Sequence, residues 1–208
     1  LDGIYQATGR GGQYIIVWPK KSIVIVYTGG GFDAGILGKG LLSAVKSDKA
    51  LPPDEKGYLK LQKMAEIALQ NPEYVTVKLL TEPPSGITYK LWKLENNPLK
   101  FQTVSIGKID ANQCELSIES EFFEFERLPV HFDNVKQISY NGKYKLPVYA
   151  TAKWVNMNEM VVNVNEISNI NSYTIRLVFE NEFLTFGFIE RSMMKNEIVL
   201  SGVTDNTP

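Results

Sequence analysis

The sequence predicts an α+β chain in two parts, with helices confined to the first part and short strands filling the second. Apolar residues recur at helical spacing only within residues 1–72. In residues 73–208, segments rich in β-branched and aromatic residues are separated by clusters of Pro, Gly, Asn and Asp. We therefore expect an N-terminal β-hairpin with two helices, followed by an antiparallel β-barrel or sandwich domain over residues 73–208.

The first part opens with two β-branched runs. Gln13 to Val17 and Ile23 to Thr28 are separated by Pro19-Lys20-Lys21, which predicts an antiparallel hairpin. Both runs are almost continuously apolar, a pattern typical of strands that are buried on both faces. Helices are therefore expected to cover this sheet.

Two helices are predicted next. Between about Asp33 and Lys46, apolar residues recur at helical spacing, although several glycines weaken the helix. Pro52-Pro53-Asp54 offers a second helix start, and an apolar face then continues to Asn71-Pro72.

The second part is predicted to be all β. The candidate strands are Val75 to Leu80, Thr88 to Leu94, Thr103 to Ile109, Gln113 to Ile118, Phe122 to Phe125, Val135 to Ser139, Ala150 to Val155, Met160 to Val164, Tyr173 to Phe179, Phe183 to Phe188 and Ile198 to Val203. From Tyr173 to Phe179, the odd-numbered positions are apolar or aromatic and are expected to face a core.

Composition argues against several partners. A net charge of −1 provides no field that would collect nucleic acid. The single cysteine, Cys114, and the single histidine, His131, leave too few soft ligands for a typical zinc site, so we expect no metal and no cofactor. We expect Cys114 to be an inert buried thiol. No apolar run reaches the length of about 20 residues that spans a bilayer, so no membrane span is expected.

Ala7 to Pro19, followed by Ile23 to Gly30, resembles the last strand pair of serine β-lactamase-like hydrolases, the class that includes class C β-lactamases and penicillin-binding proteins. In that family, a Lys/His-Thr/Ser-Gly motif lies on the strand that borders the nucleophile, and Ala7-Thr8-Gly9 takes its position here. Ala7 replaces the basic residue of the motif. A plainer explanation of the glycines is that they allow a tight turn into a hairpin.

Segments of the second part resemble the β-domain that follows the hydrolase domain in many such proteins. They are Pro84 to Leu91, Asn96 to Leu99, Tyr140 to Tyr144, Ala152 to Val155, Leu177 to Phe183 and Leu200 to Gly202. Lys100 stands where the family often has a glycine. The two resemblances together cover most of the chain.

The resemblance implies a bacterial parent enzyme in which a serine forms an acyl-enzyme with an amide or ester substrate. One wall of its site would be Thr8, Gly9, Arg10, Gly11, Gly12 and Gln13. An edge strand beside the serine can present a backbone N–H to the developing oxyanion and a threonine hydroxyl to a substrate carboxylate. Arg10 could supply the missing charge. By the same resemblance, the parent belongs in the cell envelope or is secreted.

The family's nucleophile is a Ser-x-x-Lys upstream of this hairpin, so the chain, which begins at Leu1, is expected to be part of a longer protein and inactive alone. Ser-x-x-Lys strings do occur at Ser43 to Lys46, Ser105 to Lys108 and Ser192 to Lys195. We expect all three to be chance matches, because none opens a helix.

Other polar and aromatic residues suggest weaker hypotheses. His131 could act as a base with Asp133 or Glu126, but a lone loop histidine is more often structural. A further set of acidic side chains could suggest calcium, although its alternation with phenylalanines favours a strand with one wet face. The set is Glu119, Glu121, Glu124 and Glu126. Trp92 and Trp154 could line a ligand cavity, whereas core packing is the commoner role.

Three functions stay open from the sequence. The first is the C-terminal fragment of a serine hydrolase, whose partner is the missing upstream segment of the same protein. The second is a non-enzymatic barrel that binds a small hydrophobic or carbohydrate ligand. The third is a structural interaction domain with an exposed apolar patch on the hairpin. The orphaned hairpin edge predicts either a homodimer or disorder near the start of the chain.

Overall fold

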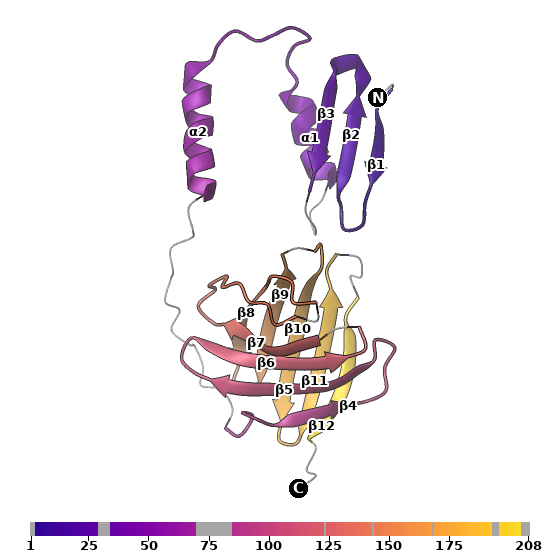
Figure 1. Cartoon of the computed structure of the whole chain (residues 1–208), viewed down its shortest axis with the longest axis vertical. Helices are drawn as coiled ribbons and strands as arrows, with labels where there is room; N and C mark the ends of the chain where they lie inside the picture. The colour runs from indigo at the N-terminus through magenta and orange to yellow at the C-terminus, as the bar shows by residue number, and fades with distance from the viewer. Residues whose placement is uncertain are drawn as a thin grey trace.

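The computed structural model describes residues 3–28, 34–69, 85–122, 124–142, 144–167, 169–192 and 196–204. Figure 1 shows a small N-terminal sheet with two helices and a separate closed barrel. The predicted α+β class with a β-barrel is therefore confirmed, and the barrel excludes the alternative of a sandwich. The predicted boundary after residue 72 and the predicted strand Val75 to Leu80 lie outside the described residues.

The N-terminal sheet has three antiparallel strands in the order β1-β2-β3. They are β1 (Tyr5–Thr8), β2 (Tyr14–Trp18) and β3 (Ile23–Tyr27). The 3-10 helix Pro19–Lys21 joins β2 to β3. The predicted hairpin is β2-β3, and β1 adds a third strand beside it, pairing Tyr5 with Val17 and Thr8 with Tyr14.

Only one face of this sheet is covered by a helix. Helix α1 (Ala34–Ala44) lies against the face that carries Ile16, Trp18, Ile23 and Ile25, with an apolar groove of about 330 Å³ between them. The opposite face, here called the outer sheet face, is entirely apolar. It consists of Tyr5, Ala7, Ile15, Val17, Val24 and Val26.

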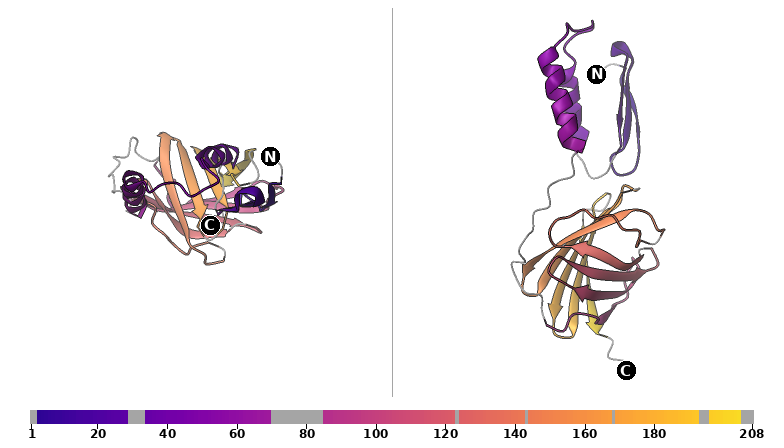
Figure 2. Two further views of the ribbon diagram at one scale, coloured as in Figure 1. Left: turned by 90° about the horizontal axis from the view of Figure 1, so that it is seen from above. Right: turned by 60° about the vertical axis from the view of Figure 1, so that its left-hand side comes forward.

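The expectation that both faces of the hairpin are buried was wrong. Val24 is 63% exposed and Val26 is 58% exposed on the outer sheet face. The physical reason is that the described chain places a helix on one side of the sheet only, as Figure 2 shows. The apolar sequence of these strands is typical of a sheet covered on both faces, but the outer sheet face has no covering layer in the described chain.

Helix α2 (Glu55–Leu69) starts where the sequence predicts, because the backbone N–H of Gly57 donates to Asp54 Oδ1 at 2.9 Å and caps the first turn. No residue of α2 is buried. Six of its apolar residues share one side of the helix, here called the α2 stripe, whereas exposed Leu59 and Ile67 lie on the other side. The stripe consists of Tyr58, Leu61, Met64, Ala65, Ala68 and Leu69.

The barrel closes in the strand order β10-β11-β12-β4-β5-β6-β7-β8-β9. The strands are β4 (Leu91–Leu94), β5 (Phe101–Ile109), β6 (Gln113–Ser120), β7 (Glu124–His131), β8 (Val148–Asn156), β9 (Glu159–Glu166), β10 (Ser172–Glu180), β11 (Phe183–Glu190) and β12 (Ile198–Thr204). The expectation of a purely antiparallel barrel was wrong at one seam. There β7 pairs in parallel with β8, through Val130 with Ala150 and His131 with Thr151.

Alternation along the strands fills the barrel with side chains. From Tyr173 to Phe179, each odd-numbered residue is buried, as the period of two predicts. Trp92 and Trp154 both contact the ring of Phe179, with centroids 5.4 and 6.0 Å away. The largest fully buried side chains are Trp92, Tyr173, Phe186, Phe188, Ile106, Leu116, Ile118, Leu128, Met160, Ile175, Leu177 and Leu184.

Two predicted strands were wrong in extent or existence. Val135 to Ser139 forms no strand; only Ser139 bridges to Val148, and Ile138 is exposed, so its apolar residues do not alternate towards the core. The strand predicted at Phe122 to Phe125 instead runs from Glu124 to His131, so His131 is not in a loop. Pro129 is tolerated within it because β7 pairs with β8 only beyond that residue.

The strand predicted at Thr88 to Leu94 starts only at Leu91. Tyr89 has a positive φ of 62°, which is incompatible with an extended strand, although Thr88 still bridges to Ile106. Neither described helix combines the length and the apolarity needed to cross a bilayer.

Candidate functional site

The predicted wall from Thr8 to Gln13 is a tight turn that joins β1 to β2. Thr8 ends β1, and the backbone N–H of Gly9 donates to the carbonyl of Gln13 at 2.7 Å. Gly11 and Gly12 have φ values of 76° and 92°, which side chains rarely adopt. The glycines are therefore required by the turn itself, so the plainer explanation of their presence holds whether or not the turn has a catalytic role.

Thr8 and Arg10 are exposed side chains at this turn. Gln6 Nε2 lies 3.5 Å from Thr8 Oγ1, at the limit of a hydrogen bond, so the threonine hydroxyl is open to solvent. Burial raises the pKa of Glu166, a carboxyl of the barrel, and the positive charge of Arg10 opposes that rise. The hypothesis that Arg10 supplies the cation missing at Ala7 stays a prediction.

The turn lies directly on the barrel rim. A Cβ added at Gly11 would be 2.6 Å from Cδ1 of Ile170, which lies between β9 and β10. Ile170 also lines an open groove of about 460 Å³ on the rim. The groove residues are Lys136, Ile138, Tyr149, Asn165, Ile167, Asn169, Ile170 and Ser172.

The groove combines one cation with amides, a hydroxyl and an apolar floor. Lys136 Nζ lies 5.7 Å from the ring centroid of Tyr149, within reach of a cation–π interaction. Lys136 belongs to the loop between β7 and β8, and Tyr149 belongs to β8. The groove can hold a small ligand with acceptor groups, although none of its residues was singled out in the sequence.

Glu166 is a half-buried carboxyl at this junction. Burial raises its pKa, while the Nδ2 groups of Asn171 and Asn169 donate to Glu166 Oε2 at 3.1 and 3.3 Å and oppose that rise. Burial also raises the pKa of Tyr173, and the neighbouring Glu166 adds to that rise. The asparagines between 163 and 171 are the sequence signal that could have indicated a polar rim here.

The serines of the Ser-x-x-Lys strings lie in three separate places: a helix, a strand and the connection after β11. Ser43 is near the end of α1 and donates to the carbonyl of Gly40 at 2.7 Å. Ser192 donates to the carbonyl of Ile170, and Ser105 lies within β5, paired with Ser117. Lys195 lies outside the described residues. None of these serines opens a helix, which is the context that the family's nucleophile requires.

His131 is buried at the end of β7. Its Nδ1 lies 3.9 Å from Asp133 Oδ1, too far for a hydrogen bond, and its Nε2 has no hydrogen-bond partner within the described chain. Glu126 lies instead beside Lys145, with Nζ and Oε2 3.9 Å apart. The hypothesis of a base formed by His131 and Glu126 therefore has no geometry to support it.

The acidic string of β6 and β7 contributes to a structural network. Glu119 and Glu124 are paired across the hairpin, and Thr103 donates to Glu119 at 3.1 Å. The described residues include no cluster of three or more acidic, His or Cys side chains placed to ligate a metal ion.

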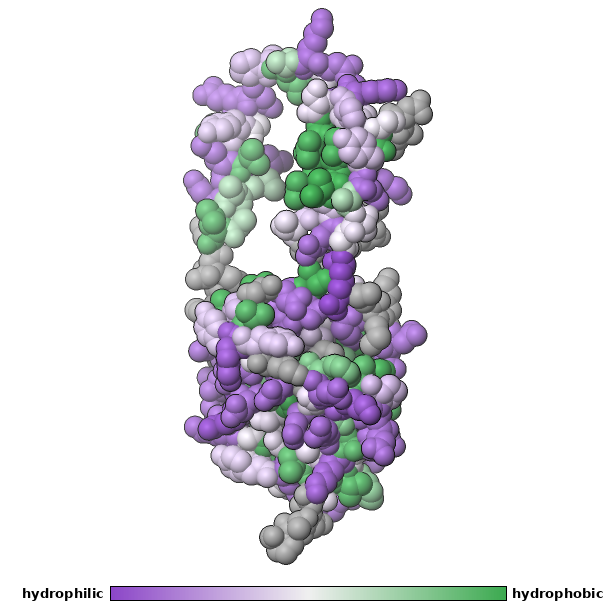
Figure 3. All heavy atoms as spheres, turned by 45° about the vertical axis from the view of Figure 1, so that its right-hand side comes forward, coloured by the Kyte–Doolittle hydropathy of each residue, from purple (hydrophilic) through white to green (hydrophobic). Residues whose placement is uncertain are grey.

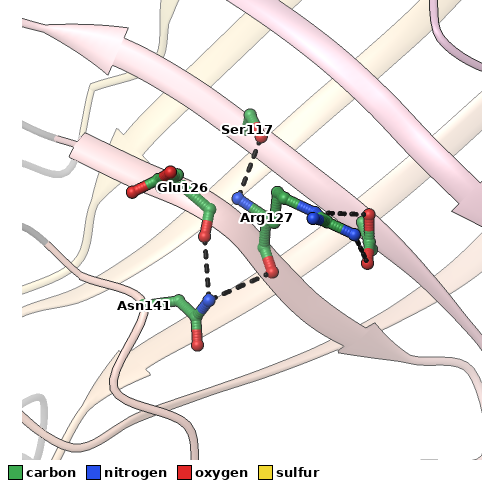
Figure 4. A network of polar contacts seen from close by, with 5 residues as sticks. Ser117, Glu126, Arg127 and Asn141 are labelled. Atoms are coloured by element: carbon green, nitrogen blue, oxygen red, sulfur yellow. Dashed lines mark hydrogen bonds and ion pairs between the residues drawn. The ribbon is translucent and has the colours of Figure 1, made fainter.

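Figure 4 shows a network that fixes the long β7–β8 loop onto the barrel wall. The Arg127 guanidinium donates to both oxygens of Glu115 at 3.1 and 3.0 Å, and its backbone N–H donates to Ser117 Oγ at 2.9 Å. Asn141 Nδ2 donates to the carbonyl of Glu126 at 2.9 Å. These hydrogen bonds hold the loop that carries Lys136 and Ile138 against the barrel.

The ligand cavity suggested for Trp92 and Trp154 gains no support, because both indoles pack on Phe179 within the filled interior.

Comparison with known proteins identified no relative of this chain. No protein-family model, no curated protein and no solved structure matches it.

Proposed function

We propose that this chain is the C-terminal part of a serine β-lactamase-like hydrolase that acts on amide or ester substrates. In this proposal, the chain contributes one wall of the active site, and an upstream segment supplies the Ser-x-x-Lys nucleophile. The chain alone is then inactive, and its barrel supports the wall.

The observation that carries the proposal is the apolar outer sheet face. A sheet with this pattern needs a layer on both sides, and α1 supplies only one of them. An upstream hydrolase segment would supply the other layer. It would also place its serine beside β1, which in the described chain pairs on one side only, with β2.

Three features of this region support the chemistry proposed for the wall. The unpaired edge of β1 can offer a backbone N–H to a developing oxyanion, and Thr8 offers an exposed hydroxyl at the end of that strand. Three of the four residues in the Gly9 to Gly12 turn carry no side chain, and Arg10 is the exception. The contact between Gly11 and Ile170 holds the turn in position.

The test is covalent labelling with a fluorescent penicillin and with a fluorophosphonate. The two proteins compared are this chain and a longer chain that extends upstream through a Ser-x-x-Lys helix. We expect label only on the longer chain, and we expect Thr8→Val to slow its acylation by about 10-fold or more, the typical effect of losing one transition-state hydrogen bond. Thr185→Val, a barrel substitution of the same chemistry, should leave the rate unchanged.

Absence of label on the longer chain would overturn the proposal. Label on this chain alone would also overturn it, because Ser43, Ser105 or Ser192 would then be a nucleophile.

A further inference from the structure

The open groove on the barrel rim, here called the rim groove, is built on a row of side chains that crosses three neighbouring strands. Asn165 of β9 pairs with Tyr149 of β8 on one side and with Ser172 of β10 on the other. All three side chains point away from the core, because burial alternates along each strand and the buried positions are the adjacent ones. The row therefore forms one continuous patch on the outer surface of the barrel.

The polar groups of this row have no hydrogen-bond partners in the part of the chain that the structure describes. The amide of Asn165 and the hydroxyls of Ser172 and Tyr149 stay unpaired there, although all three side chains are half-buried. The next row on the same face differs, because Thr174 donates to Asn163 Oδ1 at 3.0 Å. Half-buried polar groups without a protein partner must be satisfied by water or by a ligand.

One cation faces this row. Lys136 Nζ lies 5.7 Å from the ring centroid of Tyr149, and the lysine forms no ion pair with a described carboxylate. The described residues that line the groove include no carboxylate. The neighbouring Glu166 accepts hydrogen bonds from Asn169 and Asn171 instead. The groove therefore offers a positive charge and hydrogen-bond donors, which suit an anionic ligand better than a cationic one.

Three isoleucines supply the apolar part of the groove. They are Ile138, Ile167 and Ile170, of which Ile138 is 53% exposed and Ile167 is 46% exposed. Figure 3 shows that hydrophobic side chains gather mainly on the N-terminal part, and that the barrel is mostly hydrophilic on the face in view. Sites that combine apolar side chains with a few placed polar groups are typical of small-molecule binding.

Hydrogen bonds hold both sides of the groove in place. The backbone N–H of Ile167 donates to the carbonyl of Pro147 at 2.9 Å, and the N–H of Ile170 donates to Asn169 Oδ1 at 2.7 Å. Ile170 also lies against the turn between β1 and β2. On the other side, the hydrogen bonds shown in Figure 4 hold the loop that carries Lys136. A groove that is already formed loses little conformational entropy when a ligand binds.

We propose that the rim groove binds a short acidic saccharide, whose carboxylate pairs with Lys136 and whose hydroxyls bond to Asn165 and Ser172. The C–H face of the sugar ring lies on the isoleucines. Sugar hydroxyls both donate and accept, which matches an amide and a hydroxyl in one row. The groove volume of about 460 Å³ is within the range of about 300–1,000 Å³ for small-molecule sites. An amino acid fits less well, because its ammonium group finds no carboxylate in the described lining.

The experiment is an NMR titration of the isotopically labelled chain with three matched compounds. Methyl glucuronide has the carboxylate and the hydroxyls, methyl glucoside has hydroxyls alone, and cyclohexanecarboxylate has the carboxylate on an apolar ring. We expect the glucuronide to shift the backbone amides of Tyr149, Asn165 and Ser172. Each of the other two compounds should bind roughly 5-fold or more weakly, because it lacks one of the two kinds of hydrogen bond.

Paired variants test the residues. Lys136→Met should weaken glucuronide binding by about 10-fold, whereas Lys153→Met, on the same barrel wall but outside the groove, should leave it unchanged. Asn165→Ala should weaken binding roughly 5-fold. Asn163→Ala, two positions away on the same face of β9, should leave binding unchanged, because this side chain does not line the groove.

Absence of shifts at the groove amides with millimolar glucuronide would overturn the inference. Equal binding of the glucuronide and either matched compound would also overturn it, because the groove would then fail to recognise the carboxylate or the hydroxyls. Equal weakening by Lys136→Met and Lys153→Met would do the same, since general surface charge would then explain the binding. All of these measurements use this chain alone, so their outcome does not depend on acylation of the longer chain.

Discussion

Replacing Gly11 with alanine tests the contact between the N-terminal turn and the barrel rim. Gly11 has a φ of 76°, and an added Cβ would lie 2.6 Å from Ile170 Cδ1, 3.1 Å from its Cβ and 3.3 Å from its Cγ1. Rotating the end of the isoleucine would move only Cδ1 away. The alanine therefore forces the turn off the rim or displaces the backbone at Ile170.

The size of the effect has two components. A non-glycine residue at positive φ costs about 1–2 kcal/mol, and overpacking of this kind typically costs about 1–3 kcal/mol. Gly86 separates them: its φ is 77°, and an added Cβ there would meet nothing within 4 Å. Gly86→Ala should therefore show the backbone component alone, whereas Gly11→Ala should show both.

Amide hydrogen exchange is the assay, since it measures the protection of individual backbone N–H groups at the barrel rim. The backbone N–H of Glu166 donates to Asn171 at 3.1 Å, and the N–H of Arg191 donates to Ser172 at 2.8 Å, on either side of Ile170. Gly11→Ala should speed exchange at these amides roughly 10-fold or more, since 1.4 kcal/mol corresponds to tenfold. Adding Ile170→Ala should restore most of the protection. Equal exchange at the rim in Gly11→Ala and Gly86→Ala would refute the contact.

Two further predictions concern Glu166 and the barrel core. Burial raises the pKa of Glu166 above its ordinary 4.5, so the folded state keeps the proton longer than the unfolded state, and the free energy of unfolding should fall as pH rises from 4.5 through the raised pKa. Glu166→Gln should remove that fall in denaturant unfolding across a pH series; an unchanged pH slope would contradict this. Phe179→Ala should destabilise the barrel by about 3–5 kcal/mol and change the tryptophan emission, because its ring contacts Trp92 and Trp154. Phe183→Ala, at an exposed position, should have little effect on either measurement.

Alternation explains why most of the barrel could be predicted from the sequence. Where a strand has one face in the core, as from Tyr173 to Phe179, the period of two identifies both the strand and its buried side. The tight turn at Gly9 to Gly12 was also predictable, since glycine adopts the positive φ of Gly11 and Gly12 without steric cost. Both features are determined by residues that are close together in the sequence, so a short segment is enough to predict them.

The errors arise where tertiary partners decide. Val135 to Ser139 has strand-like residues, but only Ser139 bridges to β8, and β7 continues past Pro129 because β8 pairs with it only beyond that residue. The rim contact of Gly11 joins residues far apart in the chain, so no local pattern could indicate Ile170. The strands β2 and β3 are almost continuously apolar, which predicted burial on both faces, but the described chain provides no second layer to cover the outer sheet face.

The parallel seam between β7 and β8 divides the barrel into two meanders, β4 to β7 and β8 to β12, each built from neighbouring strands. A parallel seam cannot be joined by a tight hairpin, so a long connection, residues 132–147, must cross from one meander to the other. That connection forms one wall of the rim groove through Lys136 and Ile138, yet none of its described residues forms a strand of the barrel. The barrel holds this segment at several points, because Phe132 is buried in the core, Ser139 bridges to Val148 and Asn141 donates to the carbonyl of Glu126. Changes that reshape the groove with little penalty to the barrel are therefore expected between these points, at exposed positions such as Lys136.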